Sequence, residues 1–290
     1  MARVMVTVGS GPAATTAKKL VRLYASQTQG IRCLPDYLII GAKRAGTTSL
    51  SRYLVLHPCV LRPLSRKGIH YFDINFTCGQ AWYQSHFPTE AYRRLMGSLR
   101  KEQVLTGEAS PYYAFHPLSP RRIAELLPDV KLIFVLRDPV TRAHSHYHEE
   151  VARGFEPLTF EDALEAEPER LAGEVDRIRQ DPSYVSFSHQ HHSYLARGRY
   201  LDQLLIWHEV FSRDRVLVLE YEELVSNPDA VFRRALRFLE LPDSSLRTYK
   251  RFNARSYPAM DSKLKARLRS YFGDGNRDLA KYVGGDFRWT

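Results

Sequence analysis

The chain has 290 residues, of which 44% are hydrophobic and 26% are charged, and its formal net charge at pH 7 is +10. This length fits one large α/β domain or at most two small ones, and no apolar run approaches the roughly 18 residues of a membrane-spanning helix. The basic surplus predicts anionic partners, and composition alone leaves nucleic acid, membrane, an acidic polymer and an anionic cofactor all open.

We expect residues 1–30 to form a peripheral segment and residues 31–290 to form one domain. No clear signal peptide begins the chain, and no βαβ unit with a ribose-binding acid follows the G-x-G of VTVGSGPAA. The three cysteines, Cys33, Cys59 and Cys78, lack C-x-x-C spacing. They argue against a disulfide framework and a cysteine-rich metal site, and favour a reducing, cytoplasmic setting.

From residue 36 onward, segments typical of strands alternate with segments typical of helices. Short apolar runs predict buried strands in YLIIG (37–41), VKLIFVLRDP (130–139) and DRVLVLEYEEL (214–224). Helices are predicted at 47–56, after Pro139, and behind an Asn227 N-cap with Pro228 at the first helical position. The alternation predicts a single-domain α/β protein with a P-loop-like three-layer fold, a central parallel sheet flanked by helices. The charged stretch 153–190 is expected to be an irregular surface lid or insertion.

The first predicted strand runs into GAKRAGTTSL, which has the G-x-x-x-x-G frame of a phosphate loop. A nucleotide triphosphatase would continue with Lys and Ser/Thr, whereas Thr47 and Thr48 follow here and the lysine, Lys43, lies inside the loop. A strand-to-helix turn directs backbone N–H groups and the helix dipole at one anion. The sequence therefore favours an anion site that lacks the residues for binding a Mg²⁺-nucleotide. The alternative is a plain turn with exposed basic residues.

A second constellation follows the second predicted strand, in LRDPVTRAHSHY. Arg137 sits at the carboxyl end of that strand, where open α/β sheets bind ligands, and Ser145 lies eight residues on. An arginine and a serine that converge there suit a second phosphate. The alternative is that Arg137 only pairs with Asp138 or Glu149.

Together these segments resemble the sulfotransferases that use 3′-phosphoadenosine 5′-phosphosulfate (PAPS), most closely the heparan sulfate (carbohydrate) type and its bacterial relatives. GAKRAGTTSL is similar to their 5′-phosphosulfate loop, and RDPVTRAHSHY to their 3′-phosphate motif. The resemblance continues to the end of the chain, through KGIHYFD (67–73), GEASPYYAFHP (107–117), YLARGRYLDQLLIW (194–207), NARSYPAMD (253–261) and YFGDGNRDLAKYVGGDFRWT (271–290).

The resemblance implies a metal-free site for PAPS and its product, 3′-phosphoadenosine 5′-phosphate (PAP). Lys43 would stabilise the leaving 5′-phosphate, Arg137 and Ser145 would hold the 3′-phosphate, and Arg255 would clamp the donor. The other donor-binding residues expected are Arg44, Ala45, Gly46, Thr47, Thr48, Ser49 and Tyr194, and those facing the acceptor are Lys67, Tyr112 and Tyr113.

The catalytic base departs from the family pattern. The family's K-E-x-H segment carries a glutamate where this chain has Gly68, so His70 is the expected base and Glu108 the alternative. The cleft lysine of animal members corresponds to Ala109. The histidine-rich stretches HSHYH and HQHH lack an evident carboxylate partner, and no metal site is expected there.

The implied reaction is in-line transfer of a sulfuryl group to a hydroxyl or amine. The expected acceptor is a saccharide, a glycolipid or a small hydroxylated metabolite, and nucleic acid is not an expected partner because no known binding motif is present. The alternatives are a P-loop kinase acting on a small molecule with Mg²⁺-ATP, a PAP-binding relative without activity, and a non-catalytic anion-binding module.

Overall fold

The computed structural model describes residues 23–64, 68–252, 257–285, 287 and 289. Lys67 and Arg255 therefore lie outside the described residues. The same holds for residues 1–22, so the domain boundary expected at residue 30 stays a prediction.

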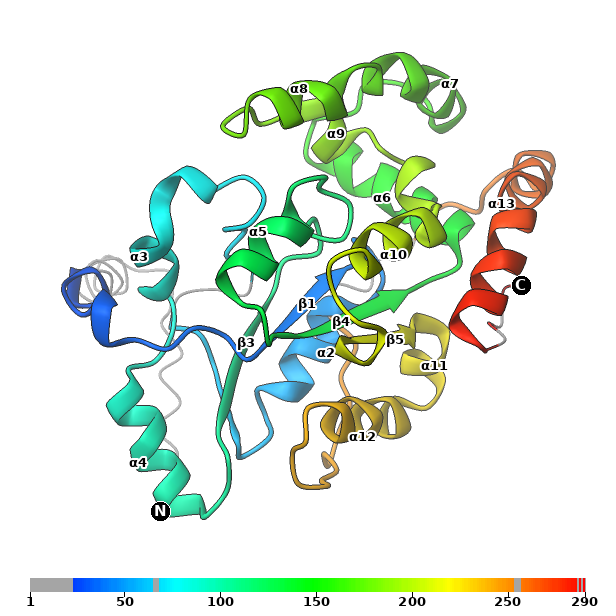
Figure 1. Ribbon diagram of the computed structural model, residues 1–290. Helices are drawn as coiled ribbons and strands as arrows, with labels where there is room; N and C mark the ends of the chain where they lie inside the picture. Colours follow the sequence, from blue (N-terminus) through cyan, green and yellow to red (C-terminus); the bar gives the residue numbers. More distant parts are fainter. Residues whose placement is uncertain (1–22, 65–67, 253–256, 286, 288, 290) are drawn as a thin grey trace.

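A five-stranded sheet with the order β2-β3-β1-β4-β5 forms the centre of the molecule (Figure 1). Every strand pairing is parallel, which confirms the predicted α/β class. The apolar runs of β1 and β4 suit their burial between two helical layers. The strands are β1 (Tyr37–Gly41), β2 (Val60–Leu61), β3 (Leu105–Ala109), β4 (Lys131–Leu136) and β5 (Val216–Glu220).

Helices cover both faces of the sheet, with α2 and α12 on one side and α5 and α10 on the other (Figure 1). The bounds are α2 (Thr47–Leu54), α3 (Gly79–Gln84), α4 (Glu90–Arg100), α5 (Ser119–Leu126), α6 (Pro139–Ala152), α7 (Phe160–Leu171), α8 (Glu174–Gln180), α9 (Phe187–His191), α10 (Tyr200–His208), α11 (Tyr221–Ser226), α12 (Pro228–Phe238) and α13 (Ser262–Val283). None of the helices in the described ranges combines the length and the apolar character needed to cross a membrane.

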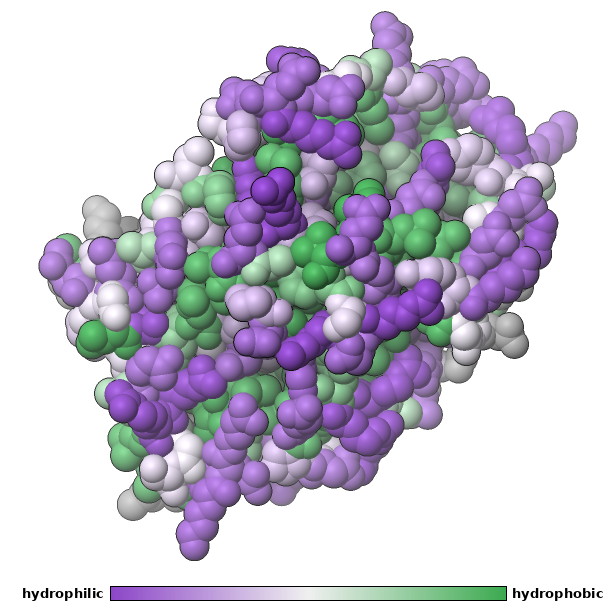
Figure 2. Space-filling view, viewed as in Figure 1, coloured by the Kyte–Doolittle hydropathy of each residue, from purple (hydrophilic) through white to green (hydrophobic). Residues whose placement is uncertain are grey.

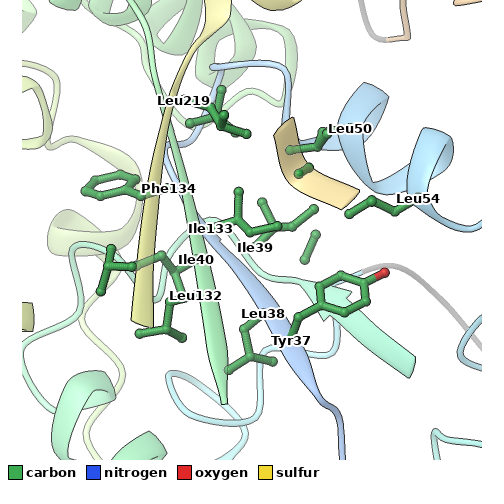
Figure 3. Packing of buried hydrophobic residues seen from close by; sticks show 14 of the residues in the cluster. Tyr37, Leu38, Ile39, Ile40, Leu50, Leu54, Leu132, Ile133, Phe134 and Leu219 are labelled. Carbon is green, nitrogen blue, oxygen red and sulfur yellow. The ribbon is translucent and has the colours of Figure 1, made fainter. Parts of the chain in front are cut away.

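Side chains of the central strands alternate between the two helical layers (Figure 3). Ile39 and Ile133 point toward Leu50 of α2, whereas Ile40 and Phe134 point to the opposite face. All five side chains are fully buried. This packing fixes the end of β1 and the start of α2, and so fixes the short loop between them.

Gly46 closes that loop in a conformation that only glycine adopts easily. Its φ is +80°, and a Cβ there would lie 2.7 Å from Tyr221 Cδ2. The glycine lets the start of α2 approach Tyr221, which directly follows β5.

The strands expected from the three apolar runs are confirmed, as is the Asn227 cap, whose side chain accepts from Ala230 N. The irregular structure expected for 153–190 is wrong, because α7, α8 and α9 occupy most of it. Thr159 and Ser186 cap α7 and α9 by accepting backbone N–H groups. These helices lie over α6 and present a hydrophilic surface (Figures 1 and 2), so their charged residues reflect solvent exposure rather than disorder.

Candidate active site

One cleft lies at the carboxyl edge of the sheet and has a volume of about 200 Å³. Parallel strands all end at this edge, so segments far apart in the chain meet there. The cleft takes its walls from the residues after β1, β3, β4 and β5, and from α6 and the segment 190–197. Among the residues predicted for the site, those lining it are Lys43, Arg44, Gly46, Thr47, Thr48, Ser49, His70, Tyr112 and Arg137.

Lys43 projects from the β1–α2 loop to two carboxylates of α6. Its Nζ lies 2.5 Å from Glu150 Oε1 and 3.8 Å from Glu149 Oε2. Burial and, to a smaller extent, the nearby charge of Arg197 lower the pKa of Lys43 to about 8, against the opposing effect of the two glutamates.

Glu150 is the buried counter-ion that holds Lys43 in place. His191 Nδ1 lies 2.9 Å from its Oε2, and His146 Nε2 lies 3.4 Å from its Oε1. Burial would raise the pKa of Glu150, but the hydrogen bond with His191, the nearby His146 and the charge of Lys43 outweigh it and hold the pKa well below its usual range. His191 of HQHH thus helps to build the cleft wall.

Arg44 connects the first loop to the second predicted phosphate motif. Its Nε donates to Ser145 Oγ over 3.0 Å, Nη2 donates to Tyr257 Oη over 2.8 Å, and Nη1 lies 3.3 Å from Glu149 Oε1. Ser145 is buried in α6 beneath this arginine. The two motifs therefore meet, as the sequence predicts.

Arg137 completes the second motif at the end of β4. Its Nη1 donates to the backbone oxygen of Arg44 over 3.0 Å, and its guanidinium lies over the Tyr221 ring at 4.7 Å. Within the described ranges no carboxylate lies at ion-pairing distance from it, so the expected alternative, a pair with Asp138 or Glu149, does not occur. The cation at this strand end is open to an anionic ligand.

The loop and the start of α2 also use some of their own polar groups. Ala45 N donates to Ala42 O over 3.1 Å, within the loop itself. Ser49 Oγ accepts from Phe252 N over 3.1 Å. Ser49 thereby anchors the chain immediately before residues 253–256.

His70 and Asp73 form a hydrogen-bonded pair at the cleft. His70 Nδ1 lies 2.7 Å from Asp73 Oδ2, and the Asp73 side chain is fully buried whereas 26% of the His70 side chain is exposed. A Cβ on Gly68 would lie only 3.0 Å from His70 Nε2. The glycine therefore leaves room for the imidazole where a longer side chain would crowd it.

Glu108 is buried behind the cleft and does not line it. Its carboxylate accepts from Ser110 Oγ and Tyr113 Oη, each over 2.6 Å, from Tyr83 Oη over 3.2 Å and from Ile69 N over 3.1 Å. Burial raises its pKa against these donors. Glu108 and Tyr113 thus face each other inside the core.

The two remaining predicted tyrosines, Tyr112 and Tyr194, differ in whether they reach the cleft. Tyr112 lines the cleft, and its Oη is hydrogen-bonded with His189 Nδ1 over 2.8 Å. Tyr194 is buried away from the cleft and donates to Glu156 Oε2 over 2.8 Å.

Sequence reasoning missed four residues that shape the cleft: Asp73, Glu150, His191 and Arg197. Asp73 and Arg197 lie inside segments that carry the family resemblance, so the motif was a usable signal for them. No sequence signal pointed to Glu150 or His191, because the residues that they contact, Lys43 for Glu150 and Glu150 for His191, are distant in the chain.

The described part of the chain holds no group of three or more potential metal ligands. His144 and His148 of α6 approach each other, with 3.0 Å between their Nε2 atoms, and His148 stacks on Tyr257 at 4.6 Å between ring centroids. The cleft lining is rich in cations and hydroxyl groups, which suits an anionic ligand.

Comparisons with known proteins agree with this geometry. The family model described as "Sulfotransferase domain" matches residues 34–272. The chain is 27% identical to the membrane-associated sulfotransferase kil1 of Dictyostelium discoideum, over 89% of this chain and 67% of that protein. It is 30% identical to the heparan sulfate glucosamine 3-O-sulfotransferase 3A1 of Mus musculus, over 90% of this chain and 66% of that protein.

These matches cover about two thirds of each curated relative's length. Among solved structures, a sulfotransferase from Alicyclobacillus acidocaldarius superposes with a TM-score of 0.65 at 30% identity, and the match covers 89% of this chain and 99% of that one. The chain therefore belongs to the sulfotransferase family, and it is a transferase enzyme.

Proposed function

We propose that the protein transfers a sulfuryl group from PAPS to a hydroxyl or amine group of a saccharide acceptor and releases PAP. The observation that carries the proposal is the meeting of two anion-binding motifs in one cleft, at the ends of β1 and β4. PAPS has two anionic groups, the 5′-phosphosulfate and the 3′-phosphate, that such a cleft can hold apart. The open guanidinium of Arg137 supports a ligand with a second phosphate.

The donor would bind with its 5′ group at the start of α2 and its 3′-phosphate between Arg137, Arg44 and Ser145. Backbone N–H groups at a helix start and the hydroxyls of Thr47 and Thr48 favour an anion there. The clamping role of Arg255 and the acceptor role of Lys67 stay predictions. The position of Tyr194 supports a structural role behind α6 rather than donor contact.

In the proposed reaction, the bond between sulfur and the bridging oxygen breaks and its electron pair stays on the 5′-phosphate. A new bond forms between sulfur and the acceptor oxygen or nitrogen, whose proton passes to a base. Lys43 stabilises the charge on the leaving phosphate, and catalysis rests mainly on positioning and charge stabilisation, as in phosphoryl transfer.

We propose His70 as the base in preference to Glu108. Asp73 accepts from His70 Nδ1–H, which leaves Nε2 as the proton acceptor. Glu108 already accepts four hydrogen bonds inside the core. The imidazole of His70 lines the cleft and is better placed to take the proton of an acceptor hydroxyl.

A saccharide acceptor is supported by the heparan sulfate sulfotransferases among the relatives and by an aromatic wall residue, Tyr112. A glycolipid or a small hydroxylated metabolite offers the same hydroxyl chemistry. The cytoplasmic setting and the absence of a nucleic-acid partner stay predictions.

The test is calorimetric titration with PAP, with 5′-AMP, and with ATP plus Mg²⁺, followed by PAP-release assays with PAPS and a panel of saccharides. The proposal expects tight PAP binding, much weaker binding of 5′-AMP, and no effect of the metal. Preference for Mg²⁺-ATP would favour the kinase alternative instead. Binding of PAP without turnover on any acceptor would favour a non-catalytic relative.

A further inference from the structure

Arg197 is a buried arginine in the wall of the cleft that no part of the donor site yet uses. It belongs to the 3-10 turn Ala196–Gly198, only 2% of its surface is exposed, and it lines the same cleft as Lys43 and His70. A buried cation is unfavourable unless it is paired or has a ligand to bind.

The protein holds this guanidinium rigidly but does not neutralise it. Nε donates to Ser193 Oγ over 2.6 Å, and Nη2 donates to the backbone oxygens of His189 and Gln190 over 3.0 and 2.8 Å. The group also lies over the ring of Tyr112 at 4.6 Å. Nη1 has no hydrogen-bond partner in the described part of the chain, and no carboxylate there forms an ion pair with Arg197.

Apart from Arg137, the other cations that line the cleft have partners, and Lys43 pairs with Glu150. Arg44 and Arg153 pair with Glu149, and Arg251 donates to Tyr221 Oη over 3.1 Å. Arg197 therefore differs from them in being fully buried while no carboxylate of the described residues lies at ion-pairing distance from it.

Arg197 lines the cleft together with Lys43 and His70, the residues proposed to act on the leaving group and on the acceptor. Its charge lowers the pKa of Lys43. Burial lowers its pKa to about 10, so it keeps its charge at neutral pH.

We propose that Arg197 binds the non-bridging oxygens of the sulfuryl group while it passes from the donor to the acceptor. The proposal rests on the function proposed above. As the bond from sulfur to the bridging oxygen breaks and the bond to the acceptor forms, negative charge spreads over these oxygens. A fixed guanidinium in a nearly dry site stabilises that charge without having to reorganise. PAP lacks the sulfuryl group, so Arg197 should contribute little to product binding.

The test compares Arg197→Met and Arg197→Lys with the wild type in kcat, KM for PAPS, and Kd for PAP. We expect Arg197→Met to lower kcat by about 10²–10³-fold, with Kd for PAP changed by less than about threefold. Arg197→Lys keeps a cation but loses the rigid, planar arrangement of donors. It should recover part of the rate, and it serves as the test if Arg197→Met does not fold.

Arg142→Met is the matched control, because Arg142 is also fully buried but does not line the cleft. It should not change the relation between kcat and PAP affinity.

Two results would overturn the role of Arg197. One is an unchanged kcat with only a lower melting temperature, which would mean that the side chain merely secures the turn after α9. The other is an equal loss in kcat and in PAP affinity. Failure of the proposed function is distinguishable, because the wild type would then bind no PAP or release none from PAPS.

Discussion

Burial makes Lys43 easier to deprotonate than an exposed lysine. We therefore expect the activity of the enzyme to fall at basic pH. Because burial lowers the pKa of Lys43 to about 8, the amine is protonated below that pH and neutral above it. The neutral amine cannot stabilise the leaving phosphate, so we expect kcat/KM for PAPS to fall as the pH rises through about 8. The measurement is kcat/KM from roughly pH 7 to pH 10, which reports the free enzyme.

Lys43→Arg is the control for this limit, because arginine stays charged throughout that range. We expect the variant to be slower at neutral pH, but its kcat/KM should not fall as the pH rises through about 8. A wild-type profile that stays flat through pH 8 would contradict the role of Lys43.

The two candidate bases differ in what their loss should do. His70→Ala should lower kcat by about 10²–10⁴-fold and leave PAP affinity nearly unchanged, because His70 acts on the acceptor. Glu108→Gln should mainly reduce stability, because the carboxylate holds four donors in the core. Steady-state kinetics, PAP titration and urea unfolding of both variants make the comparison; a folded, PAP-binding but inactive Glu108→Gln beside an active His70→Ala would reverse the assignment.

Sequence reasoning works for these residues where the chemistry is local. The places of Lys43 and Arg137 at the cleft could be predicted because a strand end or a motif sets them, while their roles and that of Ser145 stay predictions. Glu150 could not, because its partner Lys43 lies 107 residues away in the chain. Arg197 lies in a segment that resembles the family, but only the structure shows that it is buried and that its Nη1 has no hydrogen-bond partner among the described residues.

At the scale of the elements, the joint between β1 and α2 depends on one glycine. Gly46→Ala would force a Cβ into a positive φ and to within 2.7 Å of Tyr221 Cδ2. We expect it to lower the free energy of unfolding by about 2–4 kcal/mol, as strain and overpacking combine, and to weaken PAP binding by displacing the loop. Urea unfolding and PAP titration measure both effects.

Gly173→Ala separates the two causes. Gly173 also has a positive φ, +72°, but a Cβ there would meet nothing within 4 Å. This variant should lose only about 1 kcal/mol and keep its affinity for PAP. Equal losses in the two variants would show that contact with Tyr221 does not matter.

The elements that sequence analysis found and missed differ in physical character. Strands β1, β4 and β5 are apolar runs and could be predicted. Strand β3 has the sequence LTGEA, and its polar residues give no sign in the sequence that the strand is buried. Strand β2 has only two residues, too few to form a recognisable pattern. The helices of 153–190 lack a strong apolar face because much of their surface is exposed, so charge density there was a poor guide to disorder.

At the scale of the whole molecule, the cleft joins the ends of four strands to α6 and to the segment 190–197. A ligand held there contacts parts of the chain that come together only in the folded state. Its binding energy should therefore oppose unfolding of the entire domain rather than the opening of one loop. The parallel topology makes this possible, because it gathers all the strand ends at one edge.

PAP should accordingly raise the melting temperature in one cooperative step. At 100 times its Kd a ligand adds about 2.7 kcal/mol to the free energy of unfolding, which for a chain of this size corresponds to a shift of about 4 °C. 5′-AMP at the same concentration should give a much smaller shift, because it lacks the 3′-phosphate that Arg137 would bind.

Arg137→Ala should bring the PAP shift down to that of 5′-AMP. Differential scanning calorimetry of the wild type and the variant with both ligands would test this. Equal shifts from the two ligands in the wild type would mean that Arg137 does not bind a 3′-phosphate, and a PAP shift confined to a separate minor transition would mean that the cleft is not coupled to the fold as a whole.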